Sequence, residues 1–259
     1  MPCIENAMSL TLHSLPRGSA GTPRVSSTLQ TSPASLRSRA QDRYPVTAGD
    51  AVRRALNVVV ATLGLIVTAP LLLVVGALVR LDSPGPAIYR QERVGLCRRG
   101  SRDWPKVDRR RAENLGGRVF TIFKFRTMTV AQDGREVWAS RNDARITRVG
   151  RVLRATRIDE LPQLLNVLQG DMNIVGPRPE QPGIFRELRD EVHGYDRRQK
   201  VLPGITGLAQ VTLGYDTSIE DVRRKVEVDL AYIEGRSTTQ DLLIMVKTVP
   251  VVVFQKVWM

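Results

Sequence analysis

The sequence predicts a helix-rich α+β protein that enters a membrane. Three observations indicate this class. Residues 55–79 carry no charge and form a run long enough to enter a bilayer. Leucines recur with helical spacing after residue 160. Residues 119–123 are β-branched or aromatic, which is typical of a strand.

The composition excludes several classes of function for this chain. The chain has 259 residues, a formal net charge of +13 and 5% aromatic residues. A charge of this size implies a polyanionic partner, which is nucleic acid, an anionic membrane face or a phosphorylated substrate. The low aromatic content and the uncharged run argue against a nucleic-acid binder. Two cysteines exclude a disulfide framework, and two histidines leave little room for a histidine-based metal site or a Ser-His-Asp triad.

The chain divides into a leader and one domain. Residues 1–48 are rich in Ser, Thr, Pro and Arg, show no sustained apolar period, and are expected to be a disordered leader. They lack the apolar core of a secretory signal. Residues 49–259 are expected to form the membrane-anchored domain, with residues 55–79 as its membrane segment.

The course of the membrane segment is left open by the residues alone. Pro70 lies near its middle, where it removes a backbone donor and bends or breaks a helix. Arginines lie on both sides of the segment, at Arg53 and Arg54 before it and Arg80 and Arg90 after it. A helix–break–helix that returns to one face explains two basic ends. A kinked spanning helix also tolerates such a proline.

Shorter elements follow the membrane segment. Residues 87–89 predict a short strand and residues 97–118 a strongly basic loop before the strand at 119–123. Residues 145–155 alternate basic and apolar positions, which predicts an amphipathic helix on an anionic surface. Residues 242–254 are apolar but too short to span, and predict a core or interfacial helix.

An acidic pair begins the leucine-containing helix. Pro162 fits only a first helical turn, which places the start of the helix at Asp159 or Glu160, and Gly170 is a natural stop. Acids at this position are commonly capping residues. The second interpretation is an ionised nucleophile, because the helix dipole and nearby arginines would depress the carboxylate pKa of Asp159.

Arginines flank this pair on both sides. Arg154 and Arg157 precede it, and Arg178 follows between Pro177 and Pro179. The two prolines fix the backbone at Arg178, which suits bidentate recognition of phosphate. Acids beside fixed arginines are typical of a site that binds anions together with a hard divalent cation.

Three stretches carry a resemblance to a known family. Residues 124–128 (KFRTM), 145–180 (ending in DELPQLLNVLQGDMNIVGPRPE) and 197–211 (RRQKVLPGITGLAQV) resemble the bacterial sugar transferases. These are monotopic polyprenyl-phosphate hexose-1-phosphate transferases, also called phosphoglycosyl transferases. The resemblance covers the chain from about residue 50 to its end. The chain departs from the family pattern at Ala69, where serine is common, and at Leu208, where tryptophan is usual.

The resemblance implies a two-step reaction. Asp159 would attack a nucleotide diphospho-sugar, expel UMP and carry the phosphosugar, which polyprenyl phosphate would then accept. Asp159 and Glu160 would be the catalytic pair and would bind Mg²⁺, with Glu160 as the principal ligand. The phosphate-binding residues implied by the resemblance are Lys124, Arg126, Arg154 and Arg178.

The resemblance also implies a setting. The partners would be a UDP-sugar, undecaprenyl phosphate and anionic membrane lipids, without nucleic acid, in the first membrane step of exopolysaccharide, O-antigen or glycoconjugate assembly. The domain would lie on the cytoplasmic face of a bacterial inner membrane, held by a re-entrant hairpin broken at Pro70. The alternative function is a basic, non-catalytic scaffold at the membrane surface, which leaves the Asp-Glu and Pro-Arg-Pro stretches unexplained.

Overall fold

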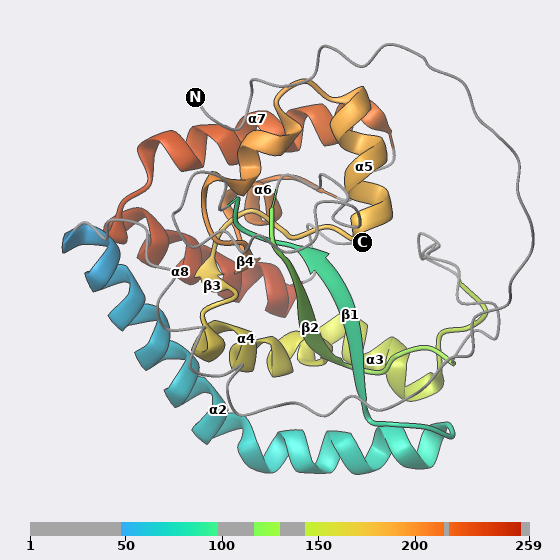
Figure 1. Cartoon of the computed structure of the whole chain (residues 1–259). Helices are drawn as coiled ribbons and strands as arrows, with labels where there is room; N and C mark the ends of the chain where they lie inside the picture. The colour runs from blue at the N-terminus through green and yellow to red at the C-terminus, as the bar shows by residue number, and fades with distance from the viewer. Residues whose placement is uncertain (1–47, 98–116, 130–142, 215–217, 255–259) are drawn as a thin grey trace, which may run out of the picture.

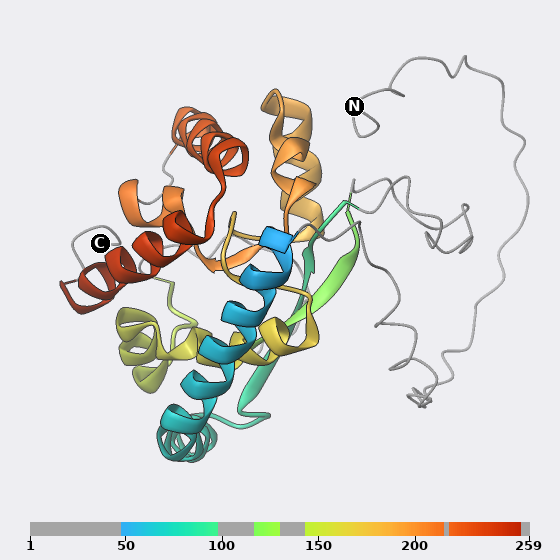
Figure 2. The same cartoon turned by 90° about the vertical axis from the view of Figure 1, so that its left-hand side faces the viewer.

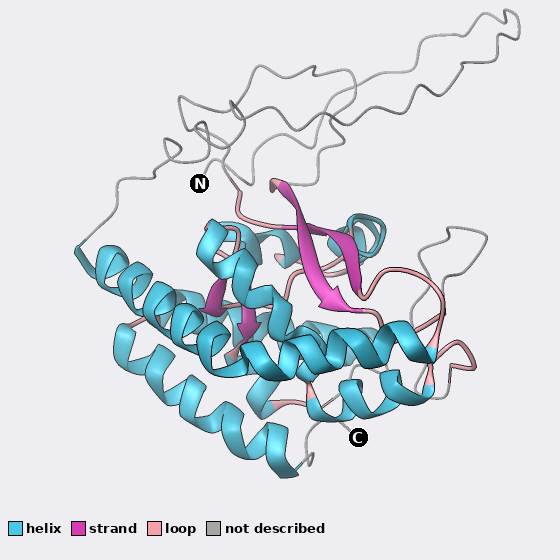
Figure 3. Cartoon of the chain, turned by 90° about the horizontal axis from the view of Figure 1, so that it is seen from below, coloured by secondary structure: helices cyan, strands magenta, loops and turns pink. Residues whose placement is uncertain are grey.

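The computed structural model describes residues 48–97, 117–129, 143–214 and 218–254. They form a helix-rich α+β fold, as predicted, with two short strand pairs among the helices (Figures 1 and 3). The predicted leader and most of the basic loop at 97–118 lie outside the described residues. The helices are α2 (Ala48–Asp82), α3 (Arg148–Thr156), α4 (Leu164–Gln169), α5 (Pro182–Glu191), α6 (Leu208–Thr212), α7 (Ile219–Gly235) and α8 (Thr238–Phe254), with 3₁₀ helices η1 (Ile158–Gln163) and η2 (Tyr195–Lys200). The strands are β1 (Ile88–Val94), β2 (Val119–Phe125), β3 (Asn173–Val175) and β4 (Gly204–Thr206).

The long apolar segment is a single helix with a bend. Helix α2 has 35 residues and remains helical through Pro70, so the helix is longer than the predicted run and is bent rather than interrupted. Pro70 has no N–H to donate, and the Thr68 hydroxyl donates to the Gly64 carbonyl at 2.6 Å, a contact that favours bending. Figure 1 shows α2 changing direction between its two halves. Its length and hydropathy are sufficient for crossing a membrane.

The start of α2 is attached to the rest of the fold. The Arg54 guanidinium donates to the Val167 carbonyl at 2.6 Å and to the Leu168 carbonyl at 3.0 Å, at the C-terminal end of α4. The buried Asn57 side chain accepts the backbone N–H of Ile174 in β3 at 2.6 Å. These polar contacts bind the first turns of α2 to the elements that surround the acidic pair.

The far end of α2 is attached to the same unit. Arg126 is 4% exposed and follows β2 directly. Its guanidinium donates to the carbonyls of Val79 at 3.1 Å, Ser83 at 2.6 Å and Pro84 at 2.6 Å. Carbonyls at the end of a helix have no partners within it. Arg126 therefore binds the end of α2 to the strand pair.

Between these attachments, α2 presents an apolar surface. Ile66, Val67 and Leu73 are 65%, 77% and 78% exposed. Helix α8 lies on the same side of the molecule as the first half of α2 (Figure 2). Exposed apolar side chains also occur on α8, at Leu242, Leu243, Val246 and Val249. The predicted helix at 242–254 is thus part of α8, and a second exposed apolar face adjoins α2.

The longer strand pair places β2 against the core. Strands β1 and β2 pair antiparallel from Ile88 opposite Phe125 to Val94 opposite Val119. The predicted strands at 87–89 and 119–123 are therefore confirmed in kind and are longer than predicted. Side chains alternate between the two faces of a strand, so Lys124 follows Phe120 and Ile122 along one face of β2, and Phe125 lies on the other face. Phe120, Ile122 and Phe125 are all buried.

The shorter strand pair requires glycines. Strands β3 and β4 are parallel, with Asn173 opposite Gly204 and Val175 opposite Thr206. A Cβ on Gly204 would lie 2.1 Å from the Gly176 nitrogen, and a Cβ on Gly176 would lie 2.5 Å from a backbone oxygen. The Pro-Gly-Ile-Thr-Gly stretch therefore supports the backbone that leads into Arg178.

Gly204→Ala should separate β3 from β4. The added methyl group meets rigid backbone, so we expect a loss of about 1–3 kcal/mol in the free energy of unfolding. Thermal unfolding in detergent, followed by circular dichroism, measures it as a lower midpoint. Gly235→Ala in α7 is the control, because its Cβ would meet only the Gln240 side chain at 4.0 Å. Equal midpoints for the two variants would contradict the close approach.

Candidate active site

A sharp backbone turn places the acidic pair. Helix α3 ends at Thr156, and Arg157 has φ 58° and ψ 11°, in the left-handed region that non-glycine residues rarely adopt. Helix η1 begins immediately afterwards, with Asp159 and Glu160 in its first turn. The predicted start of the helix is therefore close to the observed one, although the first turns are 3₁₀ rather than α-helical.

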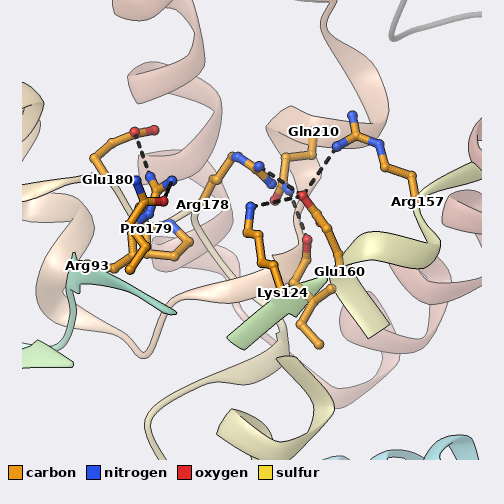
Figure 4. A network of polar contacts seen from close by, with 10 residues as sticks. Arg93, Lys124, Arg157, Glu160, Arg178, Pro179, Glu180 and Gln210 are labelled. Carbon is orange, nitrogen blue, oxygen red and sulfur yellow. Dashed lines mark hydrogen bonds and ion pairs between the residues drawn. The ribbon is translucent and has the colours of Figure 1, made fainter. Parts of the chain in front are cut away.

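Glu160 is the centre of a cluster of cations (Figure 4). It is 6% exposed. Its Oε1 lies 3.0 Å from Arg178 Nη2, 3.4 Å from Arg157 Nη1 and 3.5 Å from Lys124 Nζ. The three cations come from the β3–α5 connection, the α3–η1 junction and β2, which are distant in sequence. The fold thus gathers a concentrated positive field around one buried carboxylate.

Charge neutralisation sets the pKa of Glu160 and its partners. Burial raises the pKa of Glu160, but the charges of Arg178, Lys124 and Arg157 outweigh burial and hold it well below its usual range. Glu160 in turn raises the pKa of Arg178. Burial lowers the pKa of Lys124 to about 8, against the opposing effect of Glu160. Glu160 is therefore ionised throughout the physiological range.

Asp159 behaves differently from its neighbour. It is 8% exposed, and its buried Oδ1 has no hydrogen-bond partner among the residues that the structure describes. Burial, and next the charge of Glu160, raise the pKa of Asp159 to about 6. The sequence predicted a depressed pKa, which is wrong because Glu160 has the ion pairs with the cations while Asp159 is desolvated. Asp159 is still ionised at neutral pH, and it is less stabilised by its surroundings than Glu160.

The loop that carries Arg178 is held by two further arginines. Arg93 of β1 is buried and donates to the Pro179 carbonyl at 3.0 Å. Arg198 of η2 donates to the Arg178 carbonyl at 3.2 Å and to Asp229 at 2.8 Å. Both contacts fix the backbone at and immediately after Arg178, in addition to the two prolines. The Arg178 guanidinium is therefore positioned before any ligand arrives.

The structure brings together some of the predicted residues. Lys124 and Arg178 meet Glu160 beside Asp159, as expected from the sequence. Arg154 lies in the last turn of α3, where its Nη1 is 3.6 Å from Met128 Sδ, and no described contact joins it to Glu160. Arg126 is separate from the cluster, since its guanidinium binds the carbonyls at the end of α2.

Sequence reasoning missed two members of the site. The sequence indicates only that Arg157 precedes the acidic pair. Nothing in it indicates that the backbone of Arg157 adopts a left-handed conformation between α3 and η1. Gln210 of α6 is 7% exposed, donates to the Ile205 carbonyl at 3.0 Å, and has a buried Oε1 without a partner. Figure 4 shows it beside Glu160 and Arg178. The one sequence feature that could have indicated Gln210 is its position three residues after the Pro-Gly-Ile-Thr-Gly stretch.

The acidic pair fits a cation that is bound together with a phosphorylated ligand. Among the described residues, no group of three or more His, Cys, Asp or Glu side chains forms a complete metal site. Mg²⁺ usually needs only one or two carboxylates, with substrate phosphates and water as its other ligands. The unpartnered Oδ1 of Asp159 and the ionised Glu160 supply such oxygens. The surrounding cations would attract the phosphates.

Most of this chain is similar in sequence to known proteins. A model of the family described as bacterial sugar transferase matches residues 48–255. The chain is 43% identical over 209 residues to the UDP-glucose:undecaprenyl-phosphate glucose-1-phosphate transferase of Caulobacter vibrioides, covering 80% of this chain and 71% of that protein. It is 40% identical over 200 residues to the UDP-N-acetylgalactosamine-undecaprenyl-phosphate N-acetylgalactosaminephosphotransferase of Aeromonas hydrophila, covering 76% of this chain and 43% of that protein.

A shorter relative is covered almost completely. The chain is 35% identical over 209 residues to the exopolysaccharide production protein PSS of Rhizobium leguminosarum bv. phaseoli, covering 76% of this chain and 93% of that protein. The matched region is therefore less than half of the Aeromonas protein but nearly the whole of the Rhizobium protein.

The titration of Asp159 tests the electrostatics of the pair. Carboxyl-selective ¹³C NMR of the detergent-solubilised protein should show Asp159 titrating near pH 6 rather than near its ordinary 3.8. Glu160→Gln removes the adjacent negative charge and should lower the pKa of Asp159. Glu180→Gln, whose carboxylate pairs with Arg93 at 3.4 Å, is the control and should change it less. A pKa at or below 3.8 in the unmodified protein would contradict the assignment.

Proposed function

Because the chain belongs to the bacterial sugar transferase family, we propose that it transfers a sugar 1-phosphate from a UDP-sugar to undecaprenyl phosphate and releases UMP. The observation that carries this proposal is the buried acidic pair, in which Glu160 binds three cations and Asp159 keeps an unpartnered oxygen. This arrangement is suited to a diphosphate substrate, whose negative charge the cations would neutralise. It supplies a nucleophile without a histidine.

In the first step, the Asp159 carboxylate attacks the β-phosphorus of the UDP-sugar. A bond forms between Asp159 and this phosphorus while the diphosphate P–O bond breaks, and UMP leaves with the electron pair. An ionised carboxylate needs no base to remove a proton. Burial and the charge of Glu160 make the Asp159 carboxylate less stabilised than an exposed one, which favours attack.

In the second step, an oxygen of undecaprenyl phosphate attacks the same phosphorus. The bond to Asp159 breaks, the carboxylate is restored, and undecaprenyl diphospho-sugar leaves. Lys124, Arg157 and Arg178 would stabilise the charge on the phosphoryl oxygens in both steps. Asp159 and Glu160 are the residues that would hold Mg²⁺, which when bound would neutralise further phosphate charge.

Arg154 and Arg126 differ in what supports their expected phosphate roles. Arg154 lies on α3, close to the junction with η1, and its side chain is half-buried. From this position its guanidinium could extend toward a bound diphosphate. Arg126 has its guanidinium bound to three carbonyls, which gives it a role in holding α2. The proposed phosphate-binding set is therefore Lys124, Arg154, Arg157 and Arg178.

We propose that α2 enters the cytoplasmic leaflet of the bacterial inner membrane and returns to the same face. Both of its ends bind one folded unit, through Arg54 and Asn57 at the start and Arg126 at the end. A unit on one side of a bilayer holds both ends on that side. The uncharged stretches before and after the bend at Pro70 are about 22 Å and 15 Å long, and each is shorter than the ~30 Å hydrocarbon core.

Replacing the nucleophile tests the chemistry. Asp159→Asn should reduce UMP release by more than about 10³-fold, since an amide cannot carry the phosphosugar. The assay uses purified protein, Mg²⁺, undecaprenyl phosphate and a panel of UDP-sugars. Mass spectrometry without acceptor should find a phosphosugar on the peptide that contains Asp159. Arg126→Lys, which changes a buried cationic side chain outside the cluster, is the control.

Two results would refute this function. Full turnover by the Asp159→Asn variant would remove Asp159 as the nucleophile. No UMP release from any UDP-sugar, by a protein that remains folded and membrane-bound, would favour the non-catalytic scaffold.

Cysteine labelling from the two sides of the membrane tests the topology. In a background without Cys3 and Cys97, cysteines replacing Ala51 and Tyr89, which are exposed before and after the segment, should both react only from the cytoplasmic side. A cysteine at Val67, which is 77% exposed in the structure, is the control and should be shielded by lipid. Labelling of Ala51 and Tyr89 positions from opposite sides would exclude re-entrance.

A further inference from the structure

A cavity adjoins the acidic pair. Its volume is about 210 Å³, and it is lined by residues of η1, α4, β4, α6 and α8 and by the end of α3. Glu160 and Arg157 are the charged residues of its lining, and the remaining wall is mainly aliphatic, including Leu161, Leu164 and Val251. The lining therefore combines charged groups with a hydrocarbon-like wall, which suits an amphiphile with an anionic head.

Gln210, whose Oε1 has no hydrogen-bond partner among the described residues, also lines the cavity, but the other neutral polar groups of the wall are already bonded. The hydroxyls of Thr206 and Thr248 both line the cavity, and they bond to each other at 2.8 Å. The Thr248 hydroxyl also donates to the carbonyl of Ile244, one turn earlier in α8. A sugar or a nucleoside carries many hydroxyl and carbonyl groups, which need partners when buried. An aliphatic wall leaves them unpaired, whereas it suits a prenyl chain.

Helix α8 separates this cavity from the apolar outer surface. On the outside, Val246 and Val249 are 68% and 62% exposed, whereas Val251 and Thr248 line the cavity. Pro250 lies between Val249 and Val251 in the sequence and removes one backbone donor from the helix. The outer face of α8 would contact the membrane. Only the thickness of α8 would then separate a membrane lipid from the cavity beside the acidic pair.

We propose that this cavity holds the first isoprene units of the polyprenyl phosphate acceptor, with its phosphate beside Arg157 and Glu160. The inference rests on the proposed function, because the acceptor oxygen has to reach the phosphorus carried by Asp159. Charge complementarity orients the ligand, since the phosphate meets the cations and the chain meets Leu161, Leu164 and Val251. The donor would then occupy the polar side, near Lys124 and Arg178.

Filling the cavity tests the proposal. Val251→Trp places an indole in the space, and Val249→Trp, on the exposed face of the same helix, is the matched control. Two reactions are measured in nanodiscs that contain phosphatidylglycerol. Exchange of labelled UMP into UDP-sugar reports the first step without acceptor. Turnover against increasing undecaprenyl phosphate reports the second.

The expected result separates the two substrates. Val251→Trp should raise the KM for undecaprenyl phosphate by at least about tenfold, while UMP exchange stays within about twofold of the unmodified protein. Val249→Trp should change neither. An unchanged KM in Val251→Trp overturns the inference, and so does a loss of UMP exchange with an unchanged acceptor KM, which would assign the cavity to the donor.

A second measurement applies where the Val251→Trp variant fails to fold. A polyprenyl phosphate with a diazirine on its first isoprene unit is photolysed with the unmodified protein. Crosslinks to residues 248–252, displaced by undecaprenyl phosphate, are expected. Crosslinks confined to α2, or displaced equally by phosphatidylglycerol, overturn the inference. An unmodified protein without UMP exchange would instead refute the proposed function itself, so the two failures are distinguishable.

Discussion

The arrangement of the site depends on the compensation of one buried charge. A carboxylate removed from water is unstable unless opposite charges reach it, and Glu160 is 6% exposed. Its three partners come from β2, the α3–η1 junction and the β3–α5 connection. These elements have to converge for the fold to tolerate Glu160. The requirement also gives the site a surplus of positive charge. The same convergence buries Asp159, which has no ion pair of its own within the described part of the chain.

The pKa values of the two neighbouring acids shift in opposite directions although both side chains are buried. Burial acts on both side chains in the same direction, but only Glu160 lies within ion-pair distance of the cations, so its pKa falls while that of Asp159 rises to about 6. Glu160 therefore acts as a fixed charge that organises the cluster, and Asp159 keeps an oxygen available for chemistry. Adjacent positions in one 3₁₀ turn thus differ in role because their side chains leave the backbone in different directions.

Much of the local structure could be predicted from the sequence, because it depends on patterns over a few residues. The helix after Asp159, the strand at 119–123 and the membrane segment with Pro70 were predicted from spacing and composition. Long-range contacts were not readable in this way. Arg126 lies in the same short stretch as Lys124, yet it follows the last residue of β2, and the end of α2 offers it backbone carbonyls, so it does not join the cluster. The raised pKa of Asp159 likewise depends on burial by segments far away in the chain.

The backbone conformation of Arg157 sets two requirements against each other. A left-handed residue other than glycine costs of the order of 1 kcal/mol or more, and glycine would relieve that cost. Glycine would also remove one of the cations that stabilise Glu160. The demands of backbone stability and of a third cation beside Glu160 therefore act in opposite directions at this single residue. The left-handed arginine gives up some local stability for that cation.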